Sequence, residues 1–391
     1  MPDRQDTVLS DADRAVDAQL SAISDRYHFL LTLTPTNADT YRDEFAAGRL
    51  SEPDFHYRPL GVDPAELKAA LHAIDVSRIE DHALGSLLRS KHHEIEMHLD
   101  MLLARGTPSF LTLSIELYGA ITPSLREQAE SVLAGVPVPS PQEHLVNARE
   151  FLALANDELD RYRAVAPDID VDAQIRHDVI GVMVSDNVLL IGSDLTVAGQ
   201  RAYALLQHEV GTHLVTQING AHQPITCLGS GLAGYDETQE GLAVLAEIAS
   251  AGFTAARLRQ LAARVLTAHR RVEGASFVEA FQALVDDGFQ RRAAFTTTMR
   301  AYRAGGMTKD AIYLRGLIDL LSYVKGDGPL DLLWRGKFSL HDLPLIEDLD
   351  ERGVLRPAVV RPHYLNDPHS LDRLVAAANT SDLTALPQGA P

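Results

Sequence analysis

Apolar residues recur with a helical period along most of the first 165 residues of the chain. In the segment 10–31 they stand at i, i+4, i+7 and i+11 from Val16 onward, a spacing that places them on one face of a helix. The segment 77–106 has a similar pattern and ends at a glycine, as helices often do. The pattern therefore predicts an N-terminal region built mainly of helices.

The pattern changes in "QIRHDVIGVMVSDNVLLIG" (174–192), which is rich in valine and isoleucine. Such residues favour strands, and the polar "SDN" in the middle is typical of a turn. We expect a β-hairpin, or two short strands, at 179–184 and 187–191. Helical periodicity resumes at about residue 198 and continues to 351. The predicted fold class is therefore α+β, mostly helical, with a small sheet.

The same pattern divides the chain into three parts. We expect a helical region over 1–165 that packs on a central part over 166–365, which contains the candidate site described below. The last part, 366–391, is polar and contains proline, and we expect it to form a partly disordered C-terminal tail.

The composition excludes several classes of partner. The net charge of −19 argues against nucleic acid or an anionic membrane surface, since both require clustered lysine and arginine. No apolar run approaches the roughly 20 residues needed to cross a bilayer, and because the first residues are polar and acidic we expect no secretory signal. The single cysteine suits a reducing compartment. We therefore expect a cytoplasmic protein that has neither a membrane nor a nucleic acid as its partner.

The stretch "LLQHEVGTH" (205–213) is one residue longer than the zinc-peptidase pattern H-E-x-x-H. On a straight helix, the five-residue separation places His208 and His213 about 140° apart, which is poor geometry for two ligands of one ion. Gly211 lies between them, and a π-bulge would add one residue to the turn and return both histidines to one face. We expect a bulged helix over about 200–219.

A zinc ion needs a third protein ligand and an open position for water. In "GLAGYDETQEGLAVLAEIAS", the spacing of Asp236 and Gln239 resembles a capping arrangement, so we expect a helix to begin near Glu237. Glu240 would lie in its first turn and could complete a site with the two histidines. Glu209 would then serve as general base. Alternatively, Glu240 is structural, since the helix dipole favours an acidic first turn.

The chain contains a second H-E-x-x-x-H, in "HHEIEMH", at His93, Glu94 and His98. This copy lies in a highly charged, regular helical pattern without glycine. No predicted strand precedes it, and no glycine-rich loop with a following acidic helix is found nearby. We interpret it as a solvated helix face.

The segments "QHEVGTHLVTQING" and "GLAGYDETQEGLAVLAE" closely resemble the QEGLA-motif family, whose relatives include the microtubule-associated tyrosine carboxypeptidase. Further similar segments follow the same order along the chain: "YHFLLTLTPTNAD", "DFHYRPL", "LLARGTPSFLTLSIELYG", "MTKDAIYLRG" and "RGVLRP". The resemblance implies a zincin-like fold and one zinc ion bound by His208, His213 and Glu240, with Glu209 as the catalytic glutamate.

The resemblance also implies that a strand ahead of the motif helix holds the peptide substrate, a role that the hairpin at 179–191 could fill. Other zincins with a glutamate ligand often carry an acidic partner four residues after it, where this chain has Val244. The groups that orient the histidines are thus open, with Glu237 and Glu247 as candidates.

Peptide hydrolysis needs a donor for the developing oxyanion, and a carboxypeptidase also needs a cation for the terminal carboxylate. The segment "YRAGGMTKDAIYLRGLIDLL" is the best source of both. If Thr308 is an N-cap, Lys309 lies at the positive end of a helix, where the dipole disfavours it. We expect Tyr313 to be the oxyanion donor and Lys309 or Arg315 to bind the carboxylate. Alternatively, Tyr313 belongs to the core and both cations to the surface.

The sequence thus predicts a zinc-dependent metallocarboxypeptidase that trims the C-terminus of a peptide or protein, with tyrosine as a candidate terminal residue. A zinc endopeptidase would use the same metal chemistry. A non-catalytic metal-binding regulator, such as a modulator of flavohaemoglobin expression, is the alternative from another class. The glutamate beside His208 argues against the regulator, since metal binding alone does not require a general base.

Overall fold

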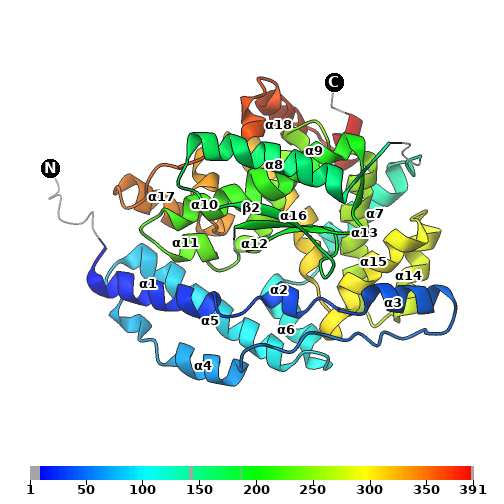
Figure 1. Ribbon diagram of the computed structural model, residues 1–391, viewed down its shortest axis with the longest axis horizontal. Coiled ribbons are helices and arrows are strands. Elements are labelled where there is room, and N and C mark those ends of the chain that lie inside the picture. The colour runs from blue at the N-terminus through cyan, green and yellow to red at the C-terminus, as the bar shows by residue number, and fades with distance from the viewer. Residues whose placement is uncertain (1–8, 141–143, 186, 389–391) are drawn as a thin grey trace.

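The protein is described here by a computed structural model that covers residues 9–140, 144–185 and 187–388. Most of these residues are helical, and short strands form two small sheets among the helices (Figure 1). The α+β class predicted from the sequence is therefore confirmed, with the helical content dominant.

The helices, in chain order, are α1 (Asp11–Ser24), α2 (Phe29–Thr32), α3 (Ala38–Ala46), α4 (Pro64–His72), α5 (His82–Leu103), α6 (Ser109–Tyr118), α7 (Pro123–Gly135), α8 (Ala148–Val165), α9 (Gly199–His208), α10 (Val215–Ala221), α11 (Cys227–Ser230), α12 (Tyr235–Ala249), α13 (Ala255–Val272), α14 (Phe277–Asp286), α15 (Arg291–Tyr302), α16 (Ile312–Lys325), α17 (Leu343–Glu351) and α18 (Ser370–Ala378). The strands are β1 (Leu145–Asn147), β2 (Asp172–Arg176), β3 (Val182–Ser185), β4 (Val188–Gly192) and β5 (Thr196–Ala198). A π-helical segment, Glu209–Leu214, joins α9 to α10.

The larger sheet has the strand order β2-β4-β3, with β2 parallel and β3 antiparallel to β4. The predicted hairpin is confirmed as β3 and β4, with Val182 opposite Ile191. Its first strand is shorter than the predicted 179–184 because Gly181 adopts a φ of 74°, which interrupts the extended backbone. Asp186, in the expected turn, lies outside the described residues. β3 occupies an edge of the sheet and packs against the π-helical segment.

One large cluster of buried apolar side chains runs through the described chain from Leu9 to Leu386. It includes residues from all three of the parts expected from the sequence, so the N-terminal helices share a core with the central part. A smaller cluster joins α3 to α14 and α15 around the aromatic rings of Tyr41, Phe277 and Phe295.

The segment 366–391 differs from the expected tail because it contains α18. This helix packs on α12 and α16, and it buries Leu374 and other apolar side chains of one face. The Ser370 hydroxyl donates a hydrogen bond to the Ala249 carbonyl at the end of α12, 3.0 Å away. Residues 389–391 lie outside the described residues.

Helices α12 and α16 pack with their backbones in contact. A Cβ atom added at Gly241 of α12 would lie 2.4 Å from the carbonyl group of Gly316, and one added at Gly316 would lie 2.2 Å from the Glu237 carbonyl oxygen. Two glycines therefore let the helices approach closely, and α12 also packs against the π-helical segment.

We expect Gly241→Ala to lower the free energy of unfolding by about 1–3 kcal/mol, because its methyl group overlaps the backbone of α16. Gly326→Ala is the matched control, since the nearest atom to its added Cβ is 3.5 Å away and its φ is negative. Urea denaturation of both variants measures the difference. Equal stabilities would show that close packing at Gly241 is not required.

Candidate active site

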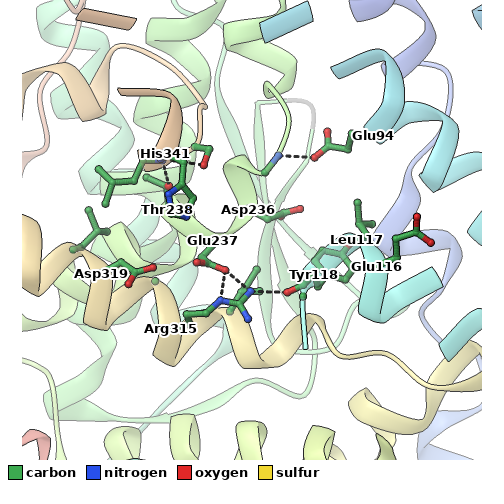
Figure 2. Close-up of a pocket in the computed structure, with 17 residues that line it drawn as sticks. Glu94, Glu116, Leu117, Tyr118, Asp236, Glu237, Thr238, Arg315, Asp319 and His341 are labelled. Carbon is green, nitrogen blue, oxygen red and sulfur yellow. Dashed lines mark hydrogen bonds and ion pairs between the residues drawn. The ribbon is translucent and has the colours of Figure 1, made fainter. Parts of the chain in front are cut away.

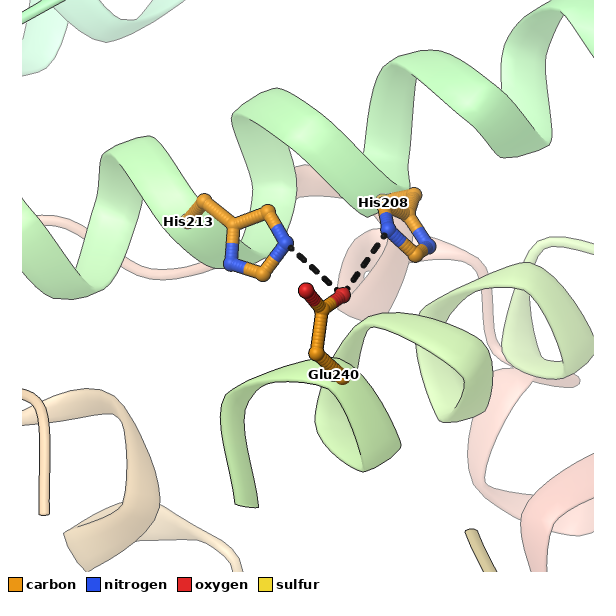
Figure 3. A group of neighbouring side chains, drawn as sticks. All are labelled: His208, His213 and Glu240. Carbon is orange, nitrogen blue, oxygen red and sulfur yellow. Dashed lines mark ion pairs between the residues drawn. The ribbon is translucent and has the colours of Figure 1, made fainter. Parts of the chain in front are cut away.

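The helix that carries the motif is continuous from α9 to α10, and its middle section is π-helical. The π-bulge predicted between His208 and His213 is therefore confirmed. A Cβ atom at Gly211 would lie 2.6 Å from the Gln207 Oε1 atom and 3.3 Å from the Tyr364 ring, so a larger residue there would require the Gln207 side chain to shift. The extra residue in the turn brings the two imidazole rings to one side of the helix, with centroids 5.2 Å apart (Figure 3).

The carboxylate of Glu240 points between the two histidines from the facing helix α12 (Figure 3). Its Oε2 atom lies 3.7 Å from His208 Nε2 and 3.6 Å from His213 Nε2. Ligand atoms about 2.0–2.1 Å from a tetrahedral zinc ion lie about 3.4 Å from each other. The Oε2 atom is buried and has no hydrogen-bond partner among the described residues. The three side chains thus fit a metal ion, both in spacing and in the acceptor atom that is left over.

Helix α12 begins at Tyr235, two residues earlier than predicted. Gly234 occupies the N-cap with a φ of 67°, and no side chain caps the helix. Asp236, which was expected in a capping role, forms an ion pair with Lys309 instead. Glu240 therefore lies in the second turn of the helix, and its position there is not explained by the preference of helix dipoles for an acidic first turn.

Glu247 holds His208 from the side opposite Glu240. Its Oε1 atom lies 2.9 Å from His208 Nδ1, and its carboxylate is bound by Arg257 and Arg201. Burial alone would raise the pKa of Glu247, but the two guanidinium groups outweigh it and keep that pKa well below its usual range. The carboxylate stays ionised and can fix the histidine ring with its Nε2 atom toward Glu240. Of the two candidates from the sequence, only Glu247 contacts a histidine of the site.

Gln239 supports the second histidine, a role that the sequence analysis did not find. Its Oε1 atom lies 3.4 Å from His213 Nδ1 and accepts a hydrogen bond of 2.7 Å from the Thr216 hydroxyl. The pattern contained a sign of this role, because Gln239 directly precedes Glu240 in the same motif. Adjacent positions of α12 thus supply a candidate ligand and the group that orients another.

Glu209 begins the π-helical segment directly after His208 and is 7% exposed. Burial raises the pKa of its carboxyl group above the usual value, although the two histidines partly offset this effect. A higher pKa makes the carboxylate a better proton acceptor near neutral pH.

Tyr313, in the first turn of α16, lies beside the histidines. Its ring is nearly parallel to that of His208, with centroids 6.5 Å apart and an interplanar angle of 11°. Burial, with the nearby charge of Glu240, raises the pKa of the phenol to about 12. The hydroxyl group therefore keeps its proton at neutral pH and is able to donate a hydrogen bond.

Lys309 is buried and already bound to two carboxylates. Its ammonium group lies 3.0 Å from Asp236 Oδ1 and 3.3 Å from Glu240 Oε1. Burial would lower the pKa of Lys309, but the two carboxylates outweigh it and raise that pKa. Thr308 stands at the expected N-cap position, but the helix that follows is the 3-10 turn Lys309–Ala311 ahead of α16, and the Thr308 side chain hydrogen-bonds to Ser114 instead of capping it. Lys309 thus contacts Oε1 of Glu240, while Oε2 is the oxygen closest to the histidines.

Arg315 is directed to a different place. Its guanidinium group pairs with Glu237 and donates a hydrogen bond of 2.5 Å to the Tyr118 carbonyl oxygen (Figure 2). Arg315, Glu237 and Tyr118 line a pocket. In the same pocket, Glu237, Asp319 and His341 lie within metal-binding distance of one another. Because Arg315 already neutralises Glu237, this second group suits a cation less well than the site at Glu240.

The second copy of the motif, in α5, is only partly a solvated face. His93 is exposed, but Glu94 and His98 are buried, so the expectation was wrong for these two residues. Glu94 pairs with Lys91 and accepts a hydrogen bond of 2.8 Å from the Gly234 amide at the start of α12. The His98 ring stacks on an aromatic ring of α2. This copy thus supports the fold beneath the candidate site.

The fold and the site define a helical α+β protein in which two histidines and a glutamate converge in a buried position suited to a metal ion. Residues 43–382 match the family described as microtubule-associated tyrosine carboxypeptidase, and the chain belongs to this family. The resemblance noted from the sequence is confirmed at this level. None of the helices in the described ranges is long and apolar enough to cross a membrane.

Two named relatives show how similar their sequences are to this chain. Human microtubule-associated tyrosine carboxypeptidase 1 is 30% identical over 216 residues, which are 51% of this chain and 44% of the human protein. The rat protein of the same name is 28% identical over 221 residues, which are 52% of this chain and 45% of the rat protein. The chain therefore spans about half the length of the curated relatives that it matches.

We expect Glu247→Gln to lower the affinity for zinc by about 10- to 100-fold, because the neutral amide holds His208 less firmly. Competition with a fluorescent zinc chelator measures the affinity, and circular dichroism checks that the variant is folded. Glu130→Gln is the control, since this exposed residue pairs with Arg126 on α7 and belongs to neither group of candidate ligands, so it should keep the wild-type affinity. Equal affinities in the two variants would contradict the role assigned to Glu247.

Proposed function

We propose that this protein is a zinc-dependent carboxypeptidase that removes the terminal residue from a peptide or protein. The observation that supports this best is the convergence of His208, His213 and Glu240 around a buried carboxylate oxygen that has no hydrogen-bond partner among the described residues. A zinc ion held by these side chains would supply a Lewis acid for hydrolysis of the peptide bond. Membership of the carboxypeptidase family supports the same reaction.

The protein's own groups would divide the remaining work. Glu209, with its raised pKa, accepts the proton of the attacking water and passes it to the leaving amine. The Tyr313 hydroxyl donates a hydrogen bond to the carbonyl oxygen of the substrate as negative charge develops on that oxygen. The Lys309 ammonium group pairs with Asp236 and with Oε1 of Glu240, and so fixes the orientation of Glu240, the proposed ligand.

The edge strand β3 is the surface on which an extended substrate would bind. In the described part of the chain β3 pairs only with β4, and it packs against the π-helical segment that carries Glu209 and His213. A peptide added to this edge would gain main-chain hydrogen bonds and would pass close to the histidines. Because the named relatives are tyrosine carboxypeptidases, we propose tyrosine as the residue removed.

Two alternatives use the same cluster. A non-catalytic metal-binding regulator has no need for a buried glutamate beside the first histidine, and so the environment of Glu209 favours catalysis. An endopeptidase would share the metal chemistry, but it would need no site for a free carboxylate.

We expect Glu209→Gln to bind zinc as the wild type does but to lower turnover of a peptide with C-terminal tyrosine by at least about 100-fold, because the amide cannot accept a proton. Mass spectrometry of the peptide products and metal analysis of the protein measure the two quantities. Glu96 belongs to the second motif region, is half-buried, and pairs with Lys68 and His72. Glu96→Gln should therefore keep full turnover. A Glu209→Gln variant with wild-type turnover would remove Glu209 as the base.

A further inference from the structure

Three arginines from neighbouring elements gather near Tyr313. They are Arg264 of α13, Arg300 of α15 and Arg303 in the turn after α15. The guanidinium carbon of Arg264 lies 4.4 Å from the centroid of the Tyr313 ring. Among the described residues, Asp310 is the one carboxylate that forms an ion pair with any of these three arginines.

Both oxygens of the Asp310 carboxylate are bound by a single arginine. Arg300 binds both oxygens of Asp310, with hydrogen bonds of 2.5 and 2.6 Å. Arg264 stands farther off, with its Nε atom 3.7 Å from Asp310 Oδ2, and its Nη1 atom is buried without a hydrogen-bond partner among the described residues. The group thus carries two positive charges more than its own carboxylate can balance.

Arg303 is the least compensated of the three. It is 5% exposed, forms no ion pair with any residue in the described ranges, and has one hydrogen bond, a long one of 3.3 Å to the Thr34 hydroxyl. Its Nε atom is buried and unpartnered in the same part of the chain. Burial, together with the charge of Arg300, lowers the pKa of Arg303 to about 10, so the group remains a cation at neutral pH. A buried guanidinium group without a counter-ion is costly, and it is well suited to bind a carboxylate through two parallel hydrogen bonds.

The backbone after Arg303 is also unusual. Ala304 has a φ of 58°, in the left-handed region that residues with a side chain seldom adopt. Its amide donates a hydrogen bond of 2.7 Å to the Tyr57 hydroxyl, and Gly305 packs against the Thr107 carbonyl oxygen, which leaves no room for a Cβ atom. Strain that the surroundings hold in place is typical of functional sites. Here it fixes the start of the Arg303 side chain.

The position suits one part of a carboxypeptidase substrate. The terminal carboxylate lies one residue, or about 3–4 Å, beyond the scissile carbonyl. Tyr313 lies near both groups, with its ring 6.5 Å from that of His208 and 4.4 Å from the guanidinium carbon of Arg264. Lys309 and Arg315, the cations expected for this role, are each bound to carboxylates of the protein itself. We propose that Arg264 and Arg303 form the subsite that binds the C-terminal carboxylate of the substrate.

This inference rests on the proposed carboxypeptidase function, but binding can be measured without turnover. The probe is a fluorescein-labelled peptide ending in Ala-Glu-Tyr, with either a free carboxylate or an amide at its end. Its affinity for the zinc-loaded full chain is measured by fluorescence anisotropy in the Glu209→Gln background. We expect the acid to bind at least tenfold more tightly than the amide, because only the acid offers a charged partner to the arginines.

Arg303→Gln and Arg264→Gln, each added to that background, should bring the affinity for the acid down to that for the amide. Arg259→Gln is the matched control, since Arg259 is also buried but donates to the carbonyl oxygens of Leu133 and Val136. It should keep the preference for the acid. Zinc content and the urea midpoint of each variant are measured in parallel, and either arginine of the pair suffices for the test if the other variant does not fold.

Two results would overturn the subsite. One is a preference for the acid that both Arg303→Gln and Arg264→Gln retain. The other is an affinity that follows the glutamate before the tyrosine, shown by a peptide with glutamine in its place, instead of the terminal carboxylate. The proposed function fails separately: a wild-type protein that prefers the acid through these arginines but cleaves no peptide would refute the peptidase and leave the subsite intact. Cleavage by the wild type, with equal affinity of the Glu209→Gln protein for acid and amide, would support the peptidase and refute the subsite.

Discussion

The burial of the Glu240 carboxylate is the constraint on which the site depends. A carboxylate out of water must be paired, and this one lies between two histidines on one side and the ammonium group of Lys309 on the other. Each partner is fixed in turn: His208 by Glu247, and Lys309 by Asp236. The network keeps charged groups in defined positions, which is the preorganisation that a metal ion and a developing oxyanion both require.

Backbone geometry brings these groups together. The π-helical turn places His208 and His213 on one side of their helix, and the contact between Gly241 and Gly316 draws α16 against α12. Helix α12 supplies the candidate ligand Glu240, and helix α16 supplies Tyr313. The glycines Gly241 and Gly316 thus serve packing, while polar residues near them form the candidate site. A protein with the same polar residues on evenly wound, more widely spaced helices would not form this cluster.

The sequence predicted the parts of the site that depend on local spacing. The five-residue separation of the histidines, with Gly211 between them, was enough to predict the bulge, and the hairpin followed from its β-branched residues. Interactions between distant segments were not predictable in the same way. Nothing near Lys309 in the sequence indicates that Asp236 neutralises it, and the burial of Glu94 against the start of α12 depends on a contact between residues 140 positions apart. The arginines near Tyr313 likewise come from two separate segments, α13 and the end of α15 with the turn after it.

Direct location of the metal tests the central claim most sharply. Crystals of the zinc-loaded protein, measured on both sides of the zinc absorption edge, would give an anomalous difference map with peaks only at zinc. The account predicts one strong peak within bonding distance of His208 Nε2, His213 Nε2 and the Glu240 carboxylate. A peak among Glu237, Asp319 and His341 alone, or no peak beside the two histidines, would contradict it.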